Sequence, residues 1–411
     1  MVSRGRVLAL LLLLPVGTTA MAAPSATAHT ASTPTPTATA GRAAPGPGRW
    51  TGTWETAPSG TAPALPGAAI RNVVHISVGG TAVRIRVSNR LGSGPLTLDA
   101  VTVALRRADG PDAVPGSMRT ATLKGARTVT VPPGLDVLTD PVPLTVPDAA
   151  DLLVTVRTPT DSGPATYHRT ALQTSYVALD GAQRADDEDG TAYTAITSRW
   201  YYVTGVDVRG EAAGSVVAFG DSLTDGNGST ADTNHRWPDR LAERLNRSRL
   251  GVLNAGVAGN RLLRDGVGPS ALARLDADAL SRAGVRALIV LEGINDIKGT
   301  PEAKDVAEFE AAYREIVARA HEHGVRVVGA TLTPYGGYTA FTAAGEEVRR
   351  KVNALIRTGG VFDAVADFDA AVRDPASPER IRPGYDPGDH LHFNDAGMQA
   401  LAAAVAPATL R

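Results

Sequence analysis

A serine, a histidine and an aspartate are placed in this chain so that nucleophilic catalysis is possible. Ser222 follows an apolar run and a glycine in residues 216–226, VVAFGDSLTDG. Near the C-terminus, Asp389 and His392 stand three apart in GDHLHFND, where Asn394 is expected to cap the last helix. In a serine hydrolase, a histidine takes the hydroxyl proton and a carboxylate holds that histidine in its tautomer. Taken alone, a serine in a turn and a histidine near a cap explain these residues equally well.

Two other segments carry groups that can stabilise a developing negative charge. In NAGVAGN, residues 254–260, glycine lets backbone N–H groups approach a substrate closely. In GIND, residues 293–296, the side-chain amide of Asn295 is a further donor. Each segment is, by itself, an ordinary strand-to-loop turn.

The elements that carry these segments begin at about residue 215, where apolar strands alternate with amphipathic helices. The strand candidates are SVVAFG, GVLNAG, ALIVLEG, VRVVGATL and VFDAVADF. The clearest helix has apolar residues at helical spacing and Gly324 as its stop: Phe309, Tyr313, Ile316, Val317 and Ala320. Residues 210–411 are therefore predicted to form an α/β domain with a doubly wound parallel sheet, whose carboxyl edge carries the active site.

Residues 49–209 are predicted to form an all-β, sandwich-like domain. Val83, Ile85 and Val87 alternate with two arginines, and Leu152, Val154 and Val156 repeat this period of two. Its aromatic residues, namely Trp50, Trp54 and the Trp200-Tyr201-Tyr202 cluster, offer a stacking surface for carbohydrate or, as such residues more often do, pack in the core.

The first 48 residues are not expected to belong to either domain. Arg4 and Arg6 precede an apolar run and small residues, which is typical of a secretory signal peptide over residues 1–28. The run is shorter than the roughly 20 residues that span a bilayer, so we expect release outside the cell without stable membrane insertion. Residues 29–48, rich in Ala, Thr and Pro, are predicted to be a linker.

Composition excludes several classes of function. With 41 basic and 42 acidic residues the net charge is -1, which gives no field to attract nucleic acid. The absence of cysteine excludes disulfides, thiolate metal sites and cysteine catalysis. A metal site at His390 and His392 lacks a wider ligand set, and the acidic stretch 186–190 lacks calcium-loop spacing. We therefore expect no metal and no cofactor, since serine chemistry needs none.

The order GDSL, NAGVAG, GIND, DHLH resembles the GDSL/SGNH hydrolase family over residues 216–405. The resemblance implies that Ser222 is the nucleophile and an N–H oxyanion donor, with Gly259 as second N–H donor and Asn295 as side-chain donor. It also implies that His392 is the base and that Asp389 orients it. Thr224 replaces the last glycine of the G-x-S-x-G elbow, which argues against an α/β-hydrolase.

A β domain before a GDSL domain is also similar to secreted bacterial SGNH hydrolases linked to polysaccharide deacetylation. This implies a secreted serine esterase that removes small acyl groups, chiefly acetyl, from carbohydrate. The alternatives are a lipase or general short-chain esterase on lipid-like esters, and a catalytically inactive carbohydrate-binding protein. Tyr335 and Tyr338, with Phe341 in TPYGGYTAF, and Tyr385 before the histidine loop are expected at the substrate, or else pack the loops together.

Overall fold

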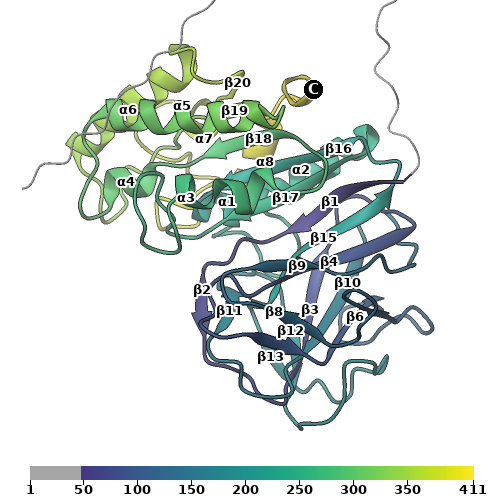
Figure 1. The fold of residues 1–411 in the computed structure, drawn as a ribbon. Helices are drawn as coiled ribbons and strands as arrows, with labels where there is room; N and C mark the ends of the chain where they lie inside the picture. The colour runs from purple at the N-terminus through teal and green to yellow at the C-terminus, as the bar shows by residue number, and fades with distance from the viewer. Residues whose placement is uncertain (1–47) are drawn as a thin grey trace, which may run out of the picture. The chain divides into compact units, whose positions relative to one another are not determined.

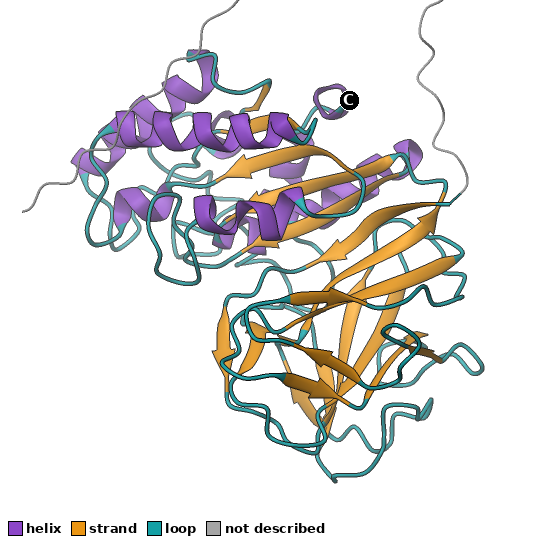
Figure 2. Ribbon diagram, in the orientation of Figure 1, coloured by secondary structure: helices purple, strands orange, loops and turns teal. Residues whose placement is uncertain are grey.

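Antiparallel strands occupy the first half of the described chain, and a parallel sheet with helices occupies the second (Figures 1 and 2). The computed structural model describes residues 48–411, which belong to one compact unit. The expected signal peptide, and the expected linker up to residue 47, lie outside the described residues.

The first half, residues 49–210, is called the β domain below. Its four-stranded sheet has the order β1 (Arg49–Glu55), β15 (Val203–Gly210), β4 (Ala82–Ser88), β9 (Asp136–Leu138). Its six-stranded sheet has the order β13 (Ala195–Thr197), β12 (Ser175–Ala178), β3 (Ala69–His75), β10 (Asp151–Arg157), β6 (Ala100–Leu105), β7 (Arg119–Ala121). The smaller sheets are β14 (Trp200–Tyr201), β11 (Ala165–His168), β2 (Gly60–Ala62), and β5 (Leu96–Leu98), β8 (Val129–Val131).

Period-two alternation builds the core of the β domain. Val83, Ile85 and Val87 on β4 pack with valines and leucines of the six-stranded sheet in one apolar cluster, so the two larger sheets face each other. Strand β10 departs from this alternation because its other face is also covered. Leu153 packs there against Val73 and other residues of a second, smaller cluster.

The aromatic residues of the β domain are mostly core residues rather than a stacking surface. Trp54 is 8% exposed, and its ring meets that of Trp200 edge-on at a centroid distance of 5.1 Å. Tyr201 and Tyr202 are buried as well. Trp50 is half-buried, and the guanidinium of Arg84 lies 4.6 Å from its ring centroid. A flat aromatic platform for sugar is therefore not formed by this cluster.

The second half, residues 214–411, contains a parallel sheet and is called the α/β domain below. The strand order is β17 (Leu250–Gly256), β16 (Gly214–Gly220), β18 (Val285–Leu291), β19 (Arg326–Ala330), β20 (Ala364–Ala366). All neighbouring strands are parallel, which confirms the predicted sheet. The chain moves from β16 outward to β17 and then returns to β18 on the other side. The strand order therefore reverses between β16 and β18, and ligands of such sheets bind beyond the carboxyl ends at that reversal.

Helices flank this sheet (Figure 2). The helices of the α/β domain are α1 (Ser222–Asp225), α2 (Trp237–Leu245), α3 (Ala271–Leu275), α4 (Ile294–Lys298), α5 (Val306–Glu322), α6 (Ala343–Thr358), α7 (Phe368–Val372) and α8 (Asp395–Ala404). Helix α5 is the predicted amphipathic helix, and Gly324 follows its end with φ +67°. Asn394 caps α8 as predicted, because its side chain accepts a hydrogen bond from the N–H of Gly397. Among residues 48–411 no helix is long and apolar enough to cross a membrane.

The end of β17 lies so close to α1 that only glycine fits there. A Cβ on Gly256 would stand 2.2 Å from the backbone nitrogen of Asp225. We expect Gly256→Ala to lower the free energy of unfolding by about 1–3 kcal/mol, because the strand and helix must move apart. Urea unfolding measures this.

The matched control is Gly384→Ala, where an added Cβ would have no neighbour within 4 Å. That change is expected to stay within about 0.5 kcal/mol of the unmodified protein. Equal unfolding midpoints for the two variants would contradict the close approach of β17 to α1.

Candidate active site

Ser222 is the first residue of α1, directly beyond the carboxyl end of β16. Asp221 caps this helix, since its Oδ1 accepts the N–H of Leu223 at 2.9 Å. The helix is only four residues long and is followed by Gly226, whose φ is +109°. This short turn holds the serine at the reversal point of the sheet, with 6% of its surface exposed.

The histidine loop brings its two predicted residues to this serine. Nε2 of His392 lies 3.0 Å from Oγ of Ser222, and its Nδ1 lies 2.5 Å from Oδ2 of Asp389. Oδ1 of Asp389 accepts the N–H groups of Leu391 at 3.0 Å and His392 at 2.9 Å. The same carboxylate therefore orients the imidazole and shapes the loop that carries it. Burial raises the pKa of Asp389, but these hydrogen bonds outweigh it and leave that pKa below its usual value.

The loop after β17 brings Gly259 to the site. Its φ of +86° lies in the left-handed region that favours glycine. Gly259 lies outside every helix and strand, and its N–H makes no hydrogen bond within residues 48–411. The N–H of Ser222 belongs to the first turn of α1, where no acceptor is available inside the helix. Two backbone donors are thus available for an incoming oxygen.

Asn295, in the second position of α4, lies between these two segments. Its Nδ2 donates to the carbonyl of Asn260 at 2.8 Å and to Oδ2 of Asp221 at 3.2 Å. The amide therefore lies beside both the nucleophile turn and the Gly259 loop. Both of its hydrogens are engaged, and the longer bond, to Asp221, is the one for which a substrate oxyanion can compete.

Arg274, on α3, makes hydrogen bonds to the same segments. It was not identified from the sequence. It is 3% exposed, and its guanidinium donates to the carbonyls of Ala255 at 2.7 Å and Gly220 at 2.9 Å. It also donates to Oδ1 of Asn260 at 2.8 Å and contacts Glu292 at 3.1 Å. One arginine in a short helix of alanine and leucine carries no local pattern that would have marked it.

The three tyrosines expected at the substrate are placed differently from one another. Tyr335 is 0% exposed and packs edge-on against Phe341, so the expectation that it contacts substrate is wrong. The side chain of Tyr335 is directed into the protein interior. The sequence does not distinguish this from an outward orientation, because a tyrosine in a loop after a strand can adopt either. Tyr338 and Tyr385 are half-buried, with the Lys298 ammonium 5.0 Å from the Tyr338 ring centroid.

The histidines of the loop are not arranged around a metal. His390 Nδ1 lies 2.5 Å from Oδ2 of Asp386, and His392 is engaged by Asp389 in the same way. Over the described part of the chain, no group of three or more His, Asp or Glu side chains is arranged to hold a metal ion.

The sequence profile of the GDSL-like Lipase/Acylhydrolase family matches residues 218–400. These residues belong to that family. The C-terminal half of the chain is thus an acylhydrolase domain, a carboxylic ester hydrolase, preceded by the β domain. The match begins just before the nucleophile turn and ends within α8, so it includes all four segments that meet at Ser222.

Several solved structures are similar to part of this chain. They include a protein from Desulfitobacterium hafniense assigned to the G-D-S-L lipolytic family, with 22% identity and a TM-score of 0.36 over 46% of this chain and 96% of that one. The aryl esterase of M. smegmatis has 17% identity and a TM-score of 0.38 over 46% and 95%. A carbohydrate acetylesterase from Sinorhizobium meliloti has 17% identity and a TM-score of 0.37 over the same shares. No curated protein matches the chain.

The position of Asn295 generates a prediction about turnover. Asn295→Ala is expected to lower kcat on a simple ester by about 100- to 1,000-fold, the usual effect of losing one oxyanion donor. Steady-state kinetics on p-nitrophenyl acetate measures this.

A buried asparagine elsewhere in the domain gives the control. Asn353 donates to the carbonyl of Leu332 at 2.8 Å and is remote in sequence from all four segments. Asn353→Ala is expected to lower the melting temperature while kcat stays near its original value. Turnover by Asn295→Ala as fast as by the unmodified enzyme would remove Asn295 from the oxyanion site.

Asp221 generates a prediction about pH. Burial raises the pKa of Asp221 to about 7, against the opposing hydrogen bond from Leu223. Between its ordinary value of 3.8 and about 7, the folded protein therefore binds more protons here than the unfolded chain. The contribution of Asp221 to the free energy of unfolding must then fall as pH rises through that window.

Asp221→Asn keeps a good capping side chain but cannot titrate. The unfolding free energy of the unmodified protein, minus that of the variant, should decrease from pH 4 to pH 7. Urea unfolding at several pH values gives this difference, and parallel curves for the two proteins would contradict it.

Proposed function

We propose that this protein is a secreted serine esterase that removes small acyl groups, acetyl in the first place, from carbohydrate. The observation that carries the catalytic part is the hydrogen-bonded series Ser222, His392, Asp389, with distances of 3.0 Å and 2.5 Å. Its position at the strand reversal of an acylhydrolase domain supports the same reading.

The proposed reaction passes through an acyl-serine. Nε2 of His392 takes the proton as Oγ of Ser222 attacks the ester carbonyl. The negative oxygen of the tetrahedral intermediate accepts hydrogen bonds from the N–H groups of Ser222 and Gly259 and from the Asn295 amide. His392 then gives its proton to the leaving alkoxide. Water, deprotonated by His392, attacks the acyl-serine, and the acid is released as His392 returns the proton to Oγ of Ser222. Throughout, Asp389 balances the charge that His392 acquires.

The preference for carbohydrate esters over lipid esters rests on the surface of the acylhydrolase domain. Among residues 48–411, the large apolar side chains that are exposed are Leu135, Leu179 and Ile196, and all three lie in the β domain. An enzyme that works at a lipid surface needs a contiguous apolar patch to meet it. The acylhydrolase domain offers none in its described residues, which favours a hydrophilic alcohol such as a sugar.

Export rests on residues 1–28, whose basic, apolar and small segments follow one another as in a secretory signal peptide. An extracellular location would give the enzyme access to polysaccharide esters. The aromatic core of the β domain gives no support to the alternative of a pure carbohydrate-binding protein, since Trp200, Tyr201 and Tyr202 are buried.

A comparison of acyl chains tests the proposal. Hydrolysis of p-nitrophenyl acetate, octanoate and palmitate is measured beside release of acetate from acetylated xylan. We expect kcat/KM to fall by at least about tenfold from acetate to octanoate, because the described residues of the domain expose no large apolar side chain whose contact would offset the ordering of a longer acyl chain.

Ser222→Ala is the control and should lose activity on every ester while keeping its fold. A preference for palmitate would replace the proposal with a lipase. Rates unchanged in Ser222→Ala would remove Ser222 from the mechanism.

A further inference from the structure

One side chain of the β domain, that of His168, contacts the short helix that carries Ser222. His168, the last residue of β11, is 2% exposed, and its Nε2 lies 2.9 Å from Oδ1 of Asp225. Its Nδ1 lies 2.8 Å from the carbonyl of Ala57. Because both partners are acceptors, both ring nitrogens must carry a hydrogen, so His168 is a cation paired with a carboxylate. Burial lowers the pKa of His168, but the charge and hydrogen bond of Asp225 outweigh it and raise that pKa overall.

Asp225 links His168 to the helix that carries Ser222 and to the loop that carries Gly259. It is the last residue of α1, three residues after Ser222, and is itself 3% exposed. Its second oxygen, Oδ2, accepts the N–H of Ala258 at 2.8 Å. Ala258 directly precedes Gly259. One carboxylate thus connects the nucleophile helix to the oxyanion loop, and His168 fixes the position of that carboxylate.

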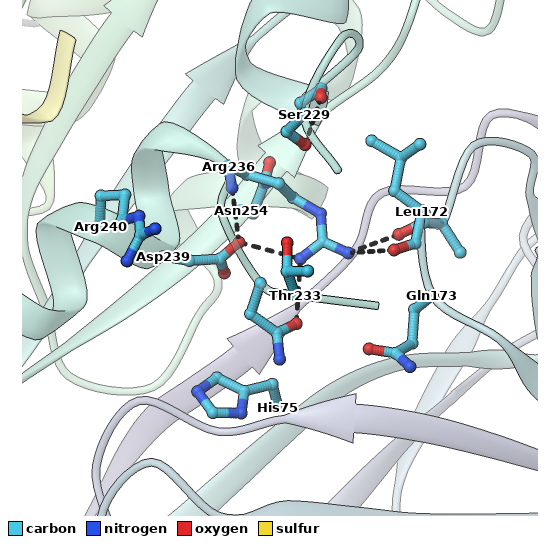
Figure 3. Close-up of polar contacts among 12 residues, drawn as sticks. His75, Leu172, Gln173, Ser229, Thr233, Arg236, Asp239, Arg240 and Asn254 are labelled. Atoms are coloured by element: carbon cyan, nitrogen blue, oxygen red, sulfur yellow. Dashed lines mark hydrogen bonds and ion pairs between the residues drawn. The ribbon is translucent and has the colours of Figure 1, made fainter. Parts of the chain in front are cut away.

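The chain that follows β11 holds the loop after α1, residues 226–236. The Asp232 carboxylate accepts hydrogen bonds from Nε2 of Gln173 at 2.8 Å and Oγ1 of Thr174 at 2.7 Å. Arg236 donates to the carbonyl of Ala171 at 2.6 Å, and Figure 3 shows its guanidinium directed to the neighbouring carbonyl of Leu172.

The same loop packs against the histidine loop. Asp395 accepts the N–H of Thr230 at 2.8 Å and lies 2.7 Å from Nδ1 of His235. A Cβ on Gly228 would stand 2.5 Å from the carbonyl oxygen of Phe393, the residue after His392. The contacts therefore run from residues 168–174 of the β domain to Ser222 and Gly259 on one side and to the His392 loop on the other.

We propose that residues 168–174 of the β domain position the catalytic groups, with His168 as the positioning residue for Ser222 and Gly259. His168 acts through Asp225 and does not touch the substrate. The β domain is accordingly a structural part of the active site rather than an appended module. This inference rests on Ser222 as the nucleophile of the proposed function.

Two substitutions of His168 separate positioning from packing. In His168→Gln the amide nitrogen can replace Nε2 and still donate to Asp225. In His168→Asn it replaces Nδ1, so the bond to Ala57 survives and the donor to Asp225 is lost. We expect His168→Asn to lower kcat on p-nitrophenyl acetate by about 10- to 100-fold with KM nearly unchanged, since a displacement of 1 Å can cost about 100-fold. His168→Gln should restore kcat to within about threefold of the original.

The matched control is His321→Asn, which removes the Nε2 donor of another histidine–aspartate pair, at the end of α5. His321 Nε2 lies 3.0 Å from Oδ2 of Asp363. This variant should keep its kcat. Hydrogen–deuterium exchange gives a readout without substrate: residues 222–236 and 257–260 should exchange faster in His168→Asn and not in His321→Asn.

Asp232→Ala keeps the test decisive if His168→Asn does not fold. Asp232 is exposed, so its loss should leave the core intact, and we expect kcat to fall several-fold with faster exchange over residues 226–236. Unchanged kcat and exchange in the folded variants would overturn the positioning role. An unmodified enzyme without activity on any ester would instead overturn the proposed function, while the exchange experiment would still decide the inference.

Discussion

The geometry of the site depends on one buried cation, the guanidinium of Arg274. The strands β16, β17 and β18 all end at the same edge of the sheet. Arg274 donates to the carbonyl of Gly220, the last residue of β16, to that of Ala255 near the end of β17 and to the Asn260 side chain, so it holds the nucleophile turn and the oxyanion loop at a fixed separation. A planar group with five donors in fixed directions can do this, whereas the single ammonium of a lysine cannot.

A buried cation must be balanced, and the polar groups connected to Arg274 extend into the β domain. Arg274 faces Glu292 and Asp278, and Asp278 is also contacted by Arg90 of the β domain. Arg282, next in this series, lies 2.6 Å from Glu55 of β1. Removing one member of such a series leaves a charge without its partner in a medium of low polarity, which is more costly than never having buried the pair. The series therefore makes the junction between the domains specific in position.

Much of the fold was readable from the sequence, for a physical reason. Parallel strands covered on both faces appear as unbroken apolar runs, so β16 to β19 were evident, and α5 followed from its helical spacing. Asp389 and His392 were found because their contact is local. Arg274 and His168 were not found, since each contacts residues far away in the chain. Such contacts produce no periodic pattern in the sequence. Tyr335 was misplaced because a loop sequence does not show which way an aromatic ring turns.

The pairing of β1 with β15 has an evolutionary consequence. The first and last strands of the β domain lie side by side, with Trp50 opposite Arg209, so both of its chain ends leave at one place. A domain attached in this way can be exchanged as a block by recombination without rerouting the rest of the chain. Asp225 makes such an exchange conditional. Its carboxylate is sealed inside the junction, so any replacement must present a hydrogen-bond donor at the position of His168. Lineages that lack this domain would be expected to show a different residue at 225, or one open to water.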